Sequence, residues 1–476
     1  MVTSGYAKYR DRPFILRRCD ADYVVLPLRC LEELKSVPEH KLSPTIAHAK
    51  NSGHKWTGGD IFAESHLHVR AIQVKLASEL PKSIDIAKAE LDYAWPLRIP
   101  DSREWQEFDI QPAIRKLVSQ LSAKVFVGYP ACRDEEWLDL SASFTMDALE
   151  TAFSIRMFPG FLHPVIASLL PANYRVAKTV RTARRILEPL VKKNKDRNRR
   201  RAAGEKVEEE EEDNTLLNWT IANGSDEENR LDKTVLRQLF LTVVSIHTTT
   251  SVATNAIFDL CAHPEWVPVL REEIESVTNE LGPIGSAPEV RVTQWLQRLE
   301  TLDSFIIESQ RTNPILLLGP QREVMEPLTL EDGTYIPRGA RICWISPKLL
   351  ANESSSITTP GPGSKPSSEA AAAAFDPLRS YAKRHASPDQ MNKHLAVHTS
   401  LDNLNFGYGK LACPGRHFAV NEVKMLLVRF VTEHDFRFTD RVGPRMLDLD
   451  EFTFPDPKVK VMIRRRQDRE EEEKGA

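Results

Sequence analysis

A single cysteine, Cys413, lies among glycines in the segment 405–419, which reads NFGYGKLACPGRHFA. The spacing Phe406-x-x-Gly409-x-x-x-Cys413-x-Gly415 arises by chance in a chain of this length with a probability of roughly a few in ten thousand. Glycines let a loop backbone approach a flat ligand because no Cβ stands in the way. The spacing therefore predicts a ligand-binding loop with one thiol at its centre.

A helical pattern follows the cysteine from His417 to Phe430, and Pro414 suits the first turn of such a helix, where its missing N–H costs nothing. We expect Cys413 at a helix N-terminus, where the dipole and the free N–H groups favour a thiolate over a thiol. A thiolate on a glycine-rich loop is a good axial ligand for haem iron. The alternative for a lone cysteine is a small buried hydrophobic residue, the role we assign to Cys19, Cys30, Cys132, Cys261 and Cys343.

Length and charge narrow the class of protein. The 476 residues can bury a sizeable core, and 64 basic against 67 acidic residues leave a net charge of −3, so nucleic acid is not an expected partner. The six cysteines show no CxxC pairs, which excludes a disulfide scaffold and a zinc ribbon and favours a reducing compartment. No run approaches the roughly 18 to 20 apolar residues of a membrane-spanning helix.

Hydrophobic periodicity predicts a mainly α chain with a minor β portion. Long segments such as 110–127 and 232–260 repeat with helical spacing, whereas strand-like runs are short, at 23–26 and within 328–344. We interpret 192–213 as a charged exposed loop and 352–374, rich in Ser, Pro, Gly and Ala, as a low-complexity insertion. Strong motifs lie on both sides of the insertion, so we expect one domain over residues 1–476.

The Cys413 segment resembles the haem-binding loop of the cytochrome P450 family, and three further stretches match that family in the expected order. The first is Glu308-Ser-Gln-Arg311, which alone is usually an exposed helix salt bridge. The second is Phe375-Asp-Pro377-Leu-Arg379. In the family, the positions that match Glu308, Arg311 and Arg379 form a network that holds the cysteine loop. The resemblance implies the cytochrome P450 fold, with haem between a long distal helix and a proximal cysteine loop.

The third stretch is SIHTTTS, residues 245–251, in the middle of a predicted helix. Clustered Thr and Ser are unfavourable there, because β-branching costs entropy and hydroxyls compete for backbone carbonyls. The resemblance matches Thr248 to the threonine that helps deliver protons at the distal haem face; the alternative is hydroxyls bonded to the backbone of a buried helix. His247 stands where many members carry an acid, and is either a proton relay or a polar group that contacts backbone.

The resemblance implies haem, iron protoporphyrin IX, as the cofactor, with Cys413 as the ligand of iron. Leu411 departs from the family, which usually has a His or Arg there that meets a haem propionate. Arg322 matches a propionate-binding arginine and is our candidate for that contact, against the alternative of a surface arginine. The cofactor-binding residues that the resemblance implies are Phe406, Gly409, Gly415, Arg322, Glu308, Arg311 and Arg379.

Electrons must reach such a site from outside, because the chain shows no flavin- or nucleotide-binding motif. The resemblance therefore implies NADPH-cytochrome P450 reductase as a partner. Three cations near the loop, Lys410, Arg416 and Lys424, predict a basic face for an acidic partner, although each alone is more often an ordinary solvated cation.

Localisation gives two expectations. Similar fungal members sit on the cytoplasmic face of the endoplasmic reticulum through an N-terminal anchor ahead of MVTSGYAKYRDRPF, so this chain, with no transmembrane segment, is expected to be soluble or truncated. The apolar segment 158–171, FPGFLHPVIASLLP, predicts either a peripheral membrane contact or a roof over the substrate pocket, and we favour pocket or core.

The resemblance is closest to fungal microsomal members of secondary metabolism, similar to ent-kaurene and gibberellin oxidases. It implies a haem-thiolate monooxygenase that inserts one oxygen atom of O2 into an apolar small molecule, a terpenoid, alkaloid or related metabolite, while the other atom leaves as water. Two alternatives stay open at this point. One is a haem-thiolate isomerase or dehydratase that needs no reductase, and the other is a non-catalytic, degenerate haem protein.

Overall fold

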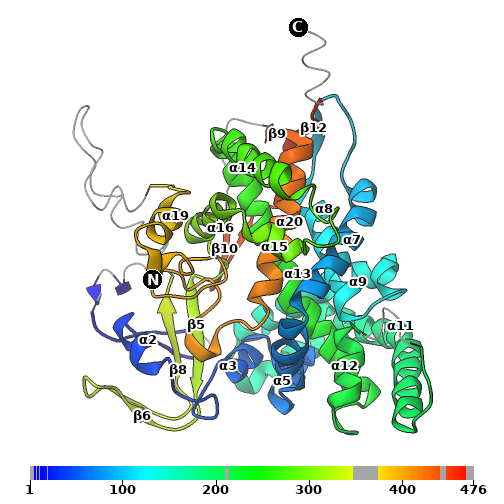
Figure 1. The fold of residues 1–476 in the computed structure, drawn as a ribbon. Coiled ribbons are helices and arrows are strands. Elements are labelled where there is room, and N and C mark those ends of the chain that lie inside the picture. Colours follow the sequence, from blue (N-terminus) through cyan, green and yellow to red (C-terminus); the bar gives the residue numbers. More distant parts are fainter. Residues whose placement is uncertain are drawn as a thin grey trace.

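The helical pattern predicted for 232–260 forms α13 (Leu231–Ala262), which runs through the middle of the molecule (Figure 1). Most of its circumference is buried, and the buried residues include polar ones such as Arg237, Gln238 and Asn255. The helices that pack against it include α8 (Ile110–Phe126), α9 (Glu135–Arg156), α16 (Glu300–Thr312) and α20 (Arg416–Glu433). Helix α13 is therefore the axis around which the helical part is built.

The computed structural model describes residues 5–6, 8–9, 11–18, 20–208, 214–346, 374–439 and 446–467. The remaining longer helices are α3 (Pro44–Asn51), α7 (Leu80–Arg98), α10 (His163–Leu169), α11 (Pro171–Ala202), α12 (Leu216–Asn223) and α14 (Trp266–Leu281). Shorter ones are α2 (Arg29–Leu34), α4 (His54–Thr57), α5 (Asp60–Glu64), α6 (Leu67–Arg70), α15 (Val292–Gln297) and α19 (Arg379–Arg384). Single turns and a π-helical stretch are η1 (Ala71–Leu76), η2 (Ala131–Arg133), η3 (Gly160–Leu162), η5 (Pro388–Gln390) and η6 (Gly409–Leu411). Among the described helices, none is long and apolar enough to cross a bilayer.

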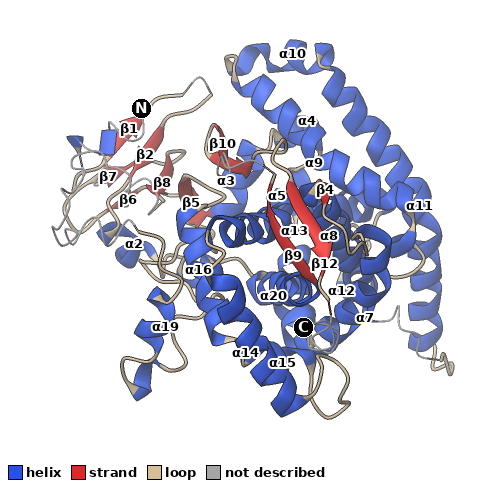
Figure 2. Cartoon of the chain, turned by 90° about the horizontal axis from the view of Figure 1, so that it is seen from above, coloured by secondary structure: helices blue, strands red, loops and turns tan. Residues whose placement is uncertain are grey.

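The main sheet lies to one side of the helical body (Figure 2). Its five strands follow the order β1-β2-β8-β5-β3, with β2 parallel to β8 and the other pairs antiparallel. Their bounds are β1 (Phe14–Leu16), β2 (Tyr23–Val25), β3 (Leu42–Ser43), β5 (Leu318–Val324) and β8 (Arg341–Ile345). Strand β5 follows α16 and contains Arg322, and it pairs with β3, which directly precedes α3. The sheet therefore joins the N-terminal part of the chain to the segment that follows α16.

Three smaller sheets complete the β portion of the residues that the structure describes. Strands β4 (Gln106–Phe108), β12 (Val461–Arg465) and β9 (His434–Phe438) form one sheet in that order. Hairpins pair β6 (Leu328–Thr329) with β7 (Tyr335–Ile336), and β10 (Met446–Leu449) with β11 (Phe452–Pro455). In the second hairpin Leu447 lies opposite Phe454, and Leu449 lies opposite Phe452.

In the described part of the chain, apolar side chains gather into one large cluster and two small ones. The large cluster fills the space between α7, α8, α13, α16 and α20. A second lies between α2 and the sheet and includes Leu404 from the approach to the cysteine loop. The third, around Tyr23 and Cys343, belongs to the sheet itself. The cysteine loop therefore lies between the helical core and the sheet.

The structure confirms the mainly α class with a minor β portion, and both long predicted helices are present as α8 and α13. The predicted charged loop at 192–213 needs correction, since α11 continues through Ala202 and buries Asn194 and Arg197. Its acidic residues 209–213, and 352–373 of the predicted insertion, lie outside the described residues. Pro414 precedes the N-cap Gly415 of α20 rather than occupying its first turn.

Candidate active site

The loop before α20 is held in shape by its own backbone. The N–H of Cys413 donates to the carbonyl of Phe406 at 2.8 Å, which closes the loop. Gly407 and Gly409 have φ of +78° and +66°, a conformation that favours glycine. A Cβ on Gly409 would come within 3.0 Å of the carbonyl oxygen of Lys35, which ends α2. Gly409 is thus required by the approach of the loop to α2, a different reason from the predicted approach to a ligand.

The thiol of Cys413 has a setting unlike that of the other described cysteines. Cys30, Cys132 and Cys343 are buried and Cys261 is half-buried, whereas Cys413 keeps an exposed side chain. A Cβ on the neighbouring Gly415 would meet no atom within 4 Å, so the loop borders open space on this side.

Opposing effects act on the pKa of the Cys413 thiol. Although the side chain of Cys413 is solvent-accessible, neighbouring protein atoms partly desolvate the sulfur and raise its pKa, whereas the backbone N–H groups of Gly415 and Arg416 and the charge of Arg416 lower it. A cation bound at the sulfur would favour the thiolate.

The three residues expected to form an ionic network are in contact. Arg311 donates to both carboxylate oxygens of Glu308, at 2.8 and 2.6 Å, and Arg379 approaches them at 3.3 and 3.5 Å. The N–H of Asp376 donates to the same carboxylate at 2.8 Å. Burial raises the pKa of Glu308, but hydrogen bonds from Arg311 and Asp376 prevail, so the net pKa is lowered and the carboxylate is charged.

Sequence reasoning missed a second part of this network, one to two turns earlier on α16. Asp303 accepts from the N–H of Ala396 at 2.7 Å and pairs with Lys424 at 2.6 Å, while Ser304 accepts from the N–H of Tyr381 at 2.9 Å. The signal was present as polar residues at helical spacing ahead of Glu308.

One face of α16 therefore holds the chain from 376 to 396, which leads into the cysteine loop.

Lys424 is buried and lies on the inner side of α20, so its predicted place on a basic surface is wrong. Arg416 is engaged by the carbonyls of Val397 and Cys413, at 2.9 and 2.8 Å, whereas Lys410 is exposed.

On α13, two adjacent residues of the Thr and Ser cluster face different surroundings. Thr248 is exposed and its hydroxyl donates to the carbonyl of Val244 at 2.8 Å. His247 lies against α9, where its Nε2 meets the carbonyl of Ala142 at 3.1 Å. Burial lowers the pKa of His247 to about 4, so the ring is neutral near pH 7. This contact favours the second interpretation of His247, a polar group satisfied by backbone.

Arg322 on β5 is buried, which excludes the alternative of a surface arginine. Its Nη1 donates to the carbonyl of Gln321 at 2.8 Å, and no carboxylate lies within ion-pairing distance among the residues that the structure describes. Burial lowers its pKa to about 10, with a smaller opposite effect from Glu39, so the guanidinium remains charged. A buried cation without a carboxylate is a good partner for an anionic ligand.

These features fit haem. An accessible thiol suits iron, the open side of Gly415 suits a flat ligand, and the buried guanidinium of Arg322 suits a propionate. Helix α13, which carries the exposed Thr248, packs against α20, the helix that follows the thiol. The chemistry of the donor groups is therefore consistent with one haem between α13 and the cysteine loop.

Comparison with known proteins gives the family. The family model for cytochrome P450 matches residues 96–354. A cytochrome P450 monooxygenase of Emericella nidulans is 37% identical over 467 residues, which cover 98% of this chain and 83% of the relative. An ent-kaurene oxidase of Gibberella intermedia is 34% identical over 474 residues, which cover 99% and 84%.

Among solved structures, the retinoic acid bound cyanobacterial CYP120A1 is similar in fold, with a TM-score of 0.65. Its sequence identity is 16%, and the match covers 98% of this chain and 94% of that one. At this identity the likeness concerns the fold alone, and it agrees with the arrangement of helices and sheets described above.

Proposed function

This chain belongs to the cytochrome P450 family, and from that premise we propose that its monooxygenase site is built on Cys413 and oxidises an apolar secondary metabolite. The observation that carries the proposal is the accessible thiol of Cys413 on a loop held by the Phe406 carbonyl and by the α16 network. The cysteine-loop motif, the three further stretches that match the family, and the geometry thus support one and the same site.

Each cofactor contact has a residue suited to it. Cys413 would ligate iron, Arg322 would neutralise a propionate, and Gly415 would leave room for the ring. When bound, haem supplies the activation of dioxygen, and a thiolate ligand favours O–O cleavage. Glu308, Arg311 and Arg379 act at a distance by holding the chain that leads into the loop.

Proton delivery is assigned to Thr248. Its hydroxyl is bonded to the Val244 carbonyl in this structure and needs only a side-chain rotation to donate elsewhere. Val244, one turn earlier, is also exposed, so the two residues present one accessible face of α13. His247 is turned toward α9 and is proposed to hold α9 and α13 together rather than to relay protons.

We infer the substrate class from the named relatives of this chain. Those named above are a monooxygenase and an ent-kaurene oxidase, and a third, the monooxygenase sdnB of Sordaria araneosa, is 36% identical over 98% of this chain. We infer a terpenoid, alkaloid or related apolar metabolite. Metabolite profiling of a host that expresses this chain with a reductase, against the same host without it, identifies the compound consumed.

The proposed redox partner is NADPH-cytochrome P450 reductase, which would meet the face of the cysteine loop. Lys410 is the exposed cation there, since Arg416 and Lys424 are engaged internally. The proposed location is the cytoplasmic face of the endoplasmic reticulum, with a peripheral membrane contact through residues 158–171.

That segment is exposed, which corrects the interpretation as pocket or core. It contains η3 and α10, and Phe161 and Leu169 are 79% and 72% exposed. Several large apolar side chains exposed on one short segment are typical of an interaction surface.

The absorption spectrum of the reduced, carbon-monoxide-bound protein tests the proposal. The wild type is expected to give the red-shifted band of thiolate ligation, and Cys413→Ala is expected to lose it. Cys261→Ala, which changes a half-buried cysteine on α13, is the matched control and should keep the band. A wild type without the band, or a Cys413→Ala variant that retains it, would overturn the site. Product formation that continues without NADPH and reductase would overturn the monooxygenase reaction.

A further inference from the structure

His48 on α3 is both accessible and surrounded by protein. Its side chain is exposed, yet neighbouring protein atoms desolvate the ring and lower its pKa to about 4. A side chain that is accessible and still desolvated faces a recess rather than an open surface. Cys413 has the same combination, since its side chain is exposed while the surrounding protein raises the pKa of the thiol. Like Cys413, His48 therefore faces a recess that a ligand can enter.

The second group at the recess of His48 is Arg322 on β5. After burial, the charge of Arg322 is the next cause of the low pKa of His48, so the guanidinium lies near enough to act on the ring. The carboxylate of Glu451 is the third cause and acts in the opposite direction. His48 therefore lies where α3 meets β5, near the turn between β10 and β11.

Strand pairing brings α3 to the edge of β5. Strand β3 pairs with β5 as far as Ser43, which lies opposite Glu323, and α3 begins at the next residue, Pro44. Proline has no N–H to continue the ladder, so the edge of β5 at Arg322 is left to the helix. The hydroxyl of Ser43 accepts from the N–H of Ile46 at 3.1 Å and thereby fixes the first turn of α3.

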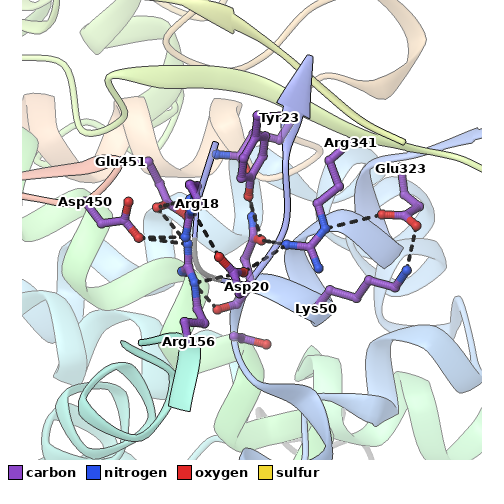
Figure 3. A network of polar contacts seen from close by, with 12 residues as sticks. Arg18, Asp20, Tyr23, Lys50, Arg156, Glu323, Arg341, Asp450 and Glu451 are labelled. Atoms are coloured by element: carbon purple, nitrogen blue, oxygen red, sulfur yellow. Dashed lines mark hydrogen bonds and ion pairs between the residues drawn. The ribbon is translucent and has the colours of Figure 1, made fainter. Parts of the chain in front are cut away.

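Contacts with the two neighbours of Arg322 hold the other end of α3. Lys50 pairs with Glu323 at 2.5 Å (Figure 3), and the side-chain amide of Asn51 donates to Gln321. Both contacts come from the last turn of α3, which also contains His48. The position of His48 relative to β5 is therefore fixed by the fold.

Arg322 lies on the face of the sheet that meets the cysteine loop. Directly paired residues of neighbouring strands place their side chains on the same face, and Arg322 is paired with Ile342 of β8. Ile342 belongs to the apolar cluster that includes Leu404 and contacts Tyr408, both from the approach to Cys413. The guanidinium therefore extends from the side of the sheet that borders the candidate haem site.

The N–H groups of Arg322 and His48 lack protein acceptors. Among the described residues, Arg322 donates only from Nη1, to the carbonyl of Gln321, and the ring of His48 forms no hydrogen bond. The Nε and Nη2 of Arg237 are enclosed by protein and unpartnered, whereas those of Arg322 are not enclosed. The free N–H groups of Arg322 therefore reach accessible space.

The two acidic residues that act on this pair are engaged elsewhere. The carboxylate of Glu451 is held by two arginines at 3.1 Å each (Figure 3), and Glu39 accepts from the hydroxyl of Thr45. An acceptor for both His48 and Arg322 therefore has to come from a ligand, and a carboxylate is the group that suits a guanidinium beside an imidazole.

We propose that His48 is a further cofactor-binding residue, which donates an N–H to the same haem propionate that Arg322 neutralises. The inference rests on the proposed haem site and adds a second propionate partner, from α3. Because His48 is neutral near pH 7, it supplies a donor without a second positive charge. A hydrogen bond to a charged acceptor is stronger than one between neutral groups, so this contact contributes to the retention of haem.

Transfer of haem from the holoprotein to apomyoglobin tests the contact. His48→Leu is expected to lose haem about tenfold faster than the wild type, because it removes a hydrogen bond to a charged group. His48→Gln keeps an N–H donor and should lose haem more slowly than His48→Leu. His40→Leu is the matched control and should behave as the wild type does, since His40 is also exposed but is not among the groups that act on the pKa of Arg322.

Holoproteins prepared with haem dimethyl ester separate a propionate contact from general support of the fold. Both carboxylates of this cofactor are blocked, so the charged acceptor is missing. The difference in cofactor loss between the wild type and His48→Leu should shrink from about tenfold with haem to about twofold or less with the ester. An equal difference with the two cofactors would overturn the propionate contact.

The outcomes distinguish this inference from the proposed site. Equal rates of haem loss in the wild type and His48→Leu, or equal acceleration in His40→Leu, would overturn the role of His48 and leave the site at Cys413 standing. A wild type without the red-shifted carbon-monoxide band would overturn the proposed site, and this inference with it.

Discussion

At the scale of single residues, neighbours in sequence receive opposite environments. Consecutive helical residues differ by about 100° around the axis, so Thr248 reaches the exposed face of α13 while His247 meets α9. A different local cause separates Cys413 from the buried cysteines. Its exposure comes from a loop, where no regular packing covers the side chain.

Substitution of Thr248 tests proton delivery. Thr248→Ala removes the hydroxyl without a large change in volume, and we expect product yield per NADPH to fall by about tenfold or more, with peroxide released instead. Thr250→Ala is the control, since Thr250 is buried two residues further on. Product and peroxide are measured together, and equal yields in the wild type and Thr248→Ala would contradict the assignment.

His247 is predicted not to titrate in the working range. Its pKa is lowered to about 4, chiefly by burial, so it is neutral from pH 5 to 8 and the activity profile over that range should not report it. His247→Gln keeps a side-chain N–H for the Ala142 carbonyl and should leave the profile unchanged. A shifted acidic limb in the profile of this variant would restore the relay interpretation.

Asp450 is expected to make stability depend on pH. Burial, followed by the charge of Glu451, raises its pKa from 3.8 to about 7 against the opposing charge of Arg18. Between about pH 4 and 7 the folded chain therefore binds a proton that the unfolded chain has released, so the free energy of unfolding falls as pH rises through this window.

Urea unfolding at several pH values measures this contribution. Asp450→Asn should lose it, and asparagine also tolerates the φ of +57° at this position. Asp448→Asn, an exposed carboxyl nearby, should keep the wild-type dependence. Identical pH slopes in the wild type and Asp450→Asn would contradict the prediction.

At the scale of elements, α16 serves as a scaffold. Polar residues at positions 300, 303, 304 and 308 all contact the chain between 376 and 396, and Lys424 of α20 joins the same face. The pair Glu308 and Arg311 is therefore more than a surface salt bridge, since its carboxylate is 2% exposed and also accepts a backbone N–H.

Loss of the Glu308 charge should destabilise the fold and the haem site together. Glu308→Gln leaves Arg311 and Arg379 without their carboxylate, and we expect a loss of about 3 to 5 kcal/mol. Glu280→Gln breaks the exposed pair with Arg298, which measures 2.7 Å, and should cost less than about 1 kcal/mol. Chemical unfolding and haem content are the measurements, and similar losses in the two variants would contradict the scaffold.

At the scale of the whole molecule, two faces have different composition. Exposed apolar side chains such as Phe161 and Leu169 lie on residues 158–171, whereas the face of the cysteine loop offers Lys410.

Charge reversal at Lys410 tests the second face. Lys410→Glu should slow reduction by the reductase several-fold at low salt, with the difference shrinking as ionic strength rises, because screening weakens exposed charge pairs. Reduction by dithionite should be unchanged. Lys393→Glu is the control, because Lys393 is an exposed lysine that pairs with the exposed carboxylate of Asp389. Equal reductase rates in the wild type and Lys410→Glu would place the contact elsewhere.

The sequence by itself determined the helical class, the two long helices and the motif around Cys413, because periodicity and spacing are local properties of the chain. Tertiary structure decided what depends on distant partners. It buried Lys424 against Asp303, and it exposed much of residues 158–171, where pocket or core was predicted. Burial and charge pairing are sums over neighbours from the whole chain, and no local pattern contains them.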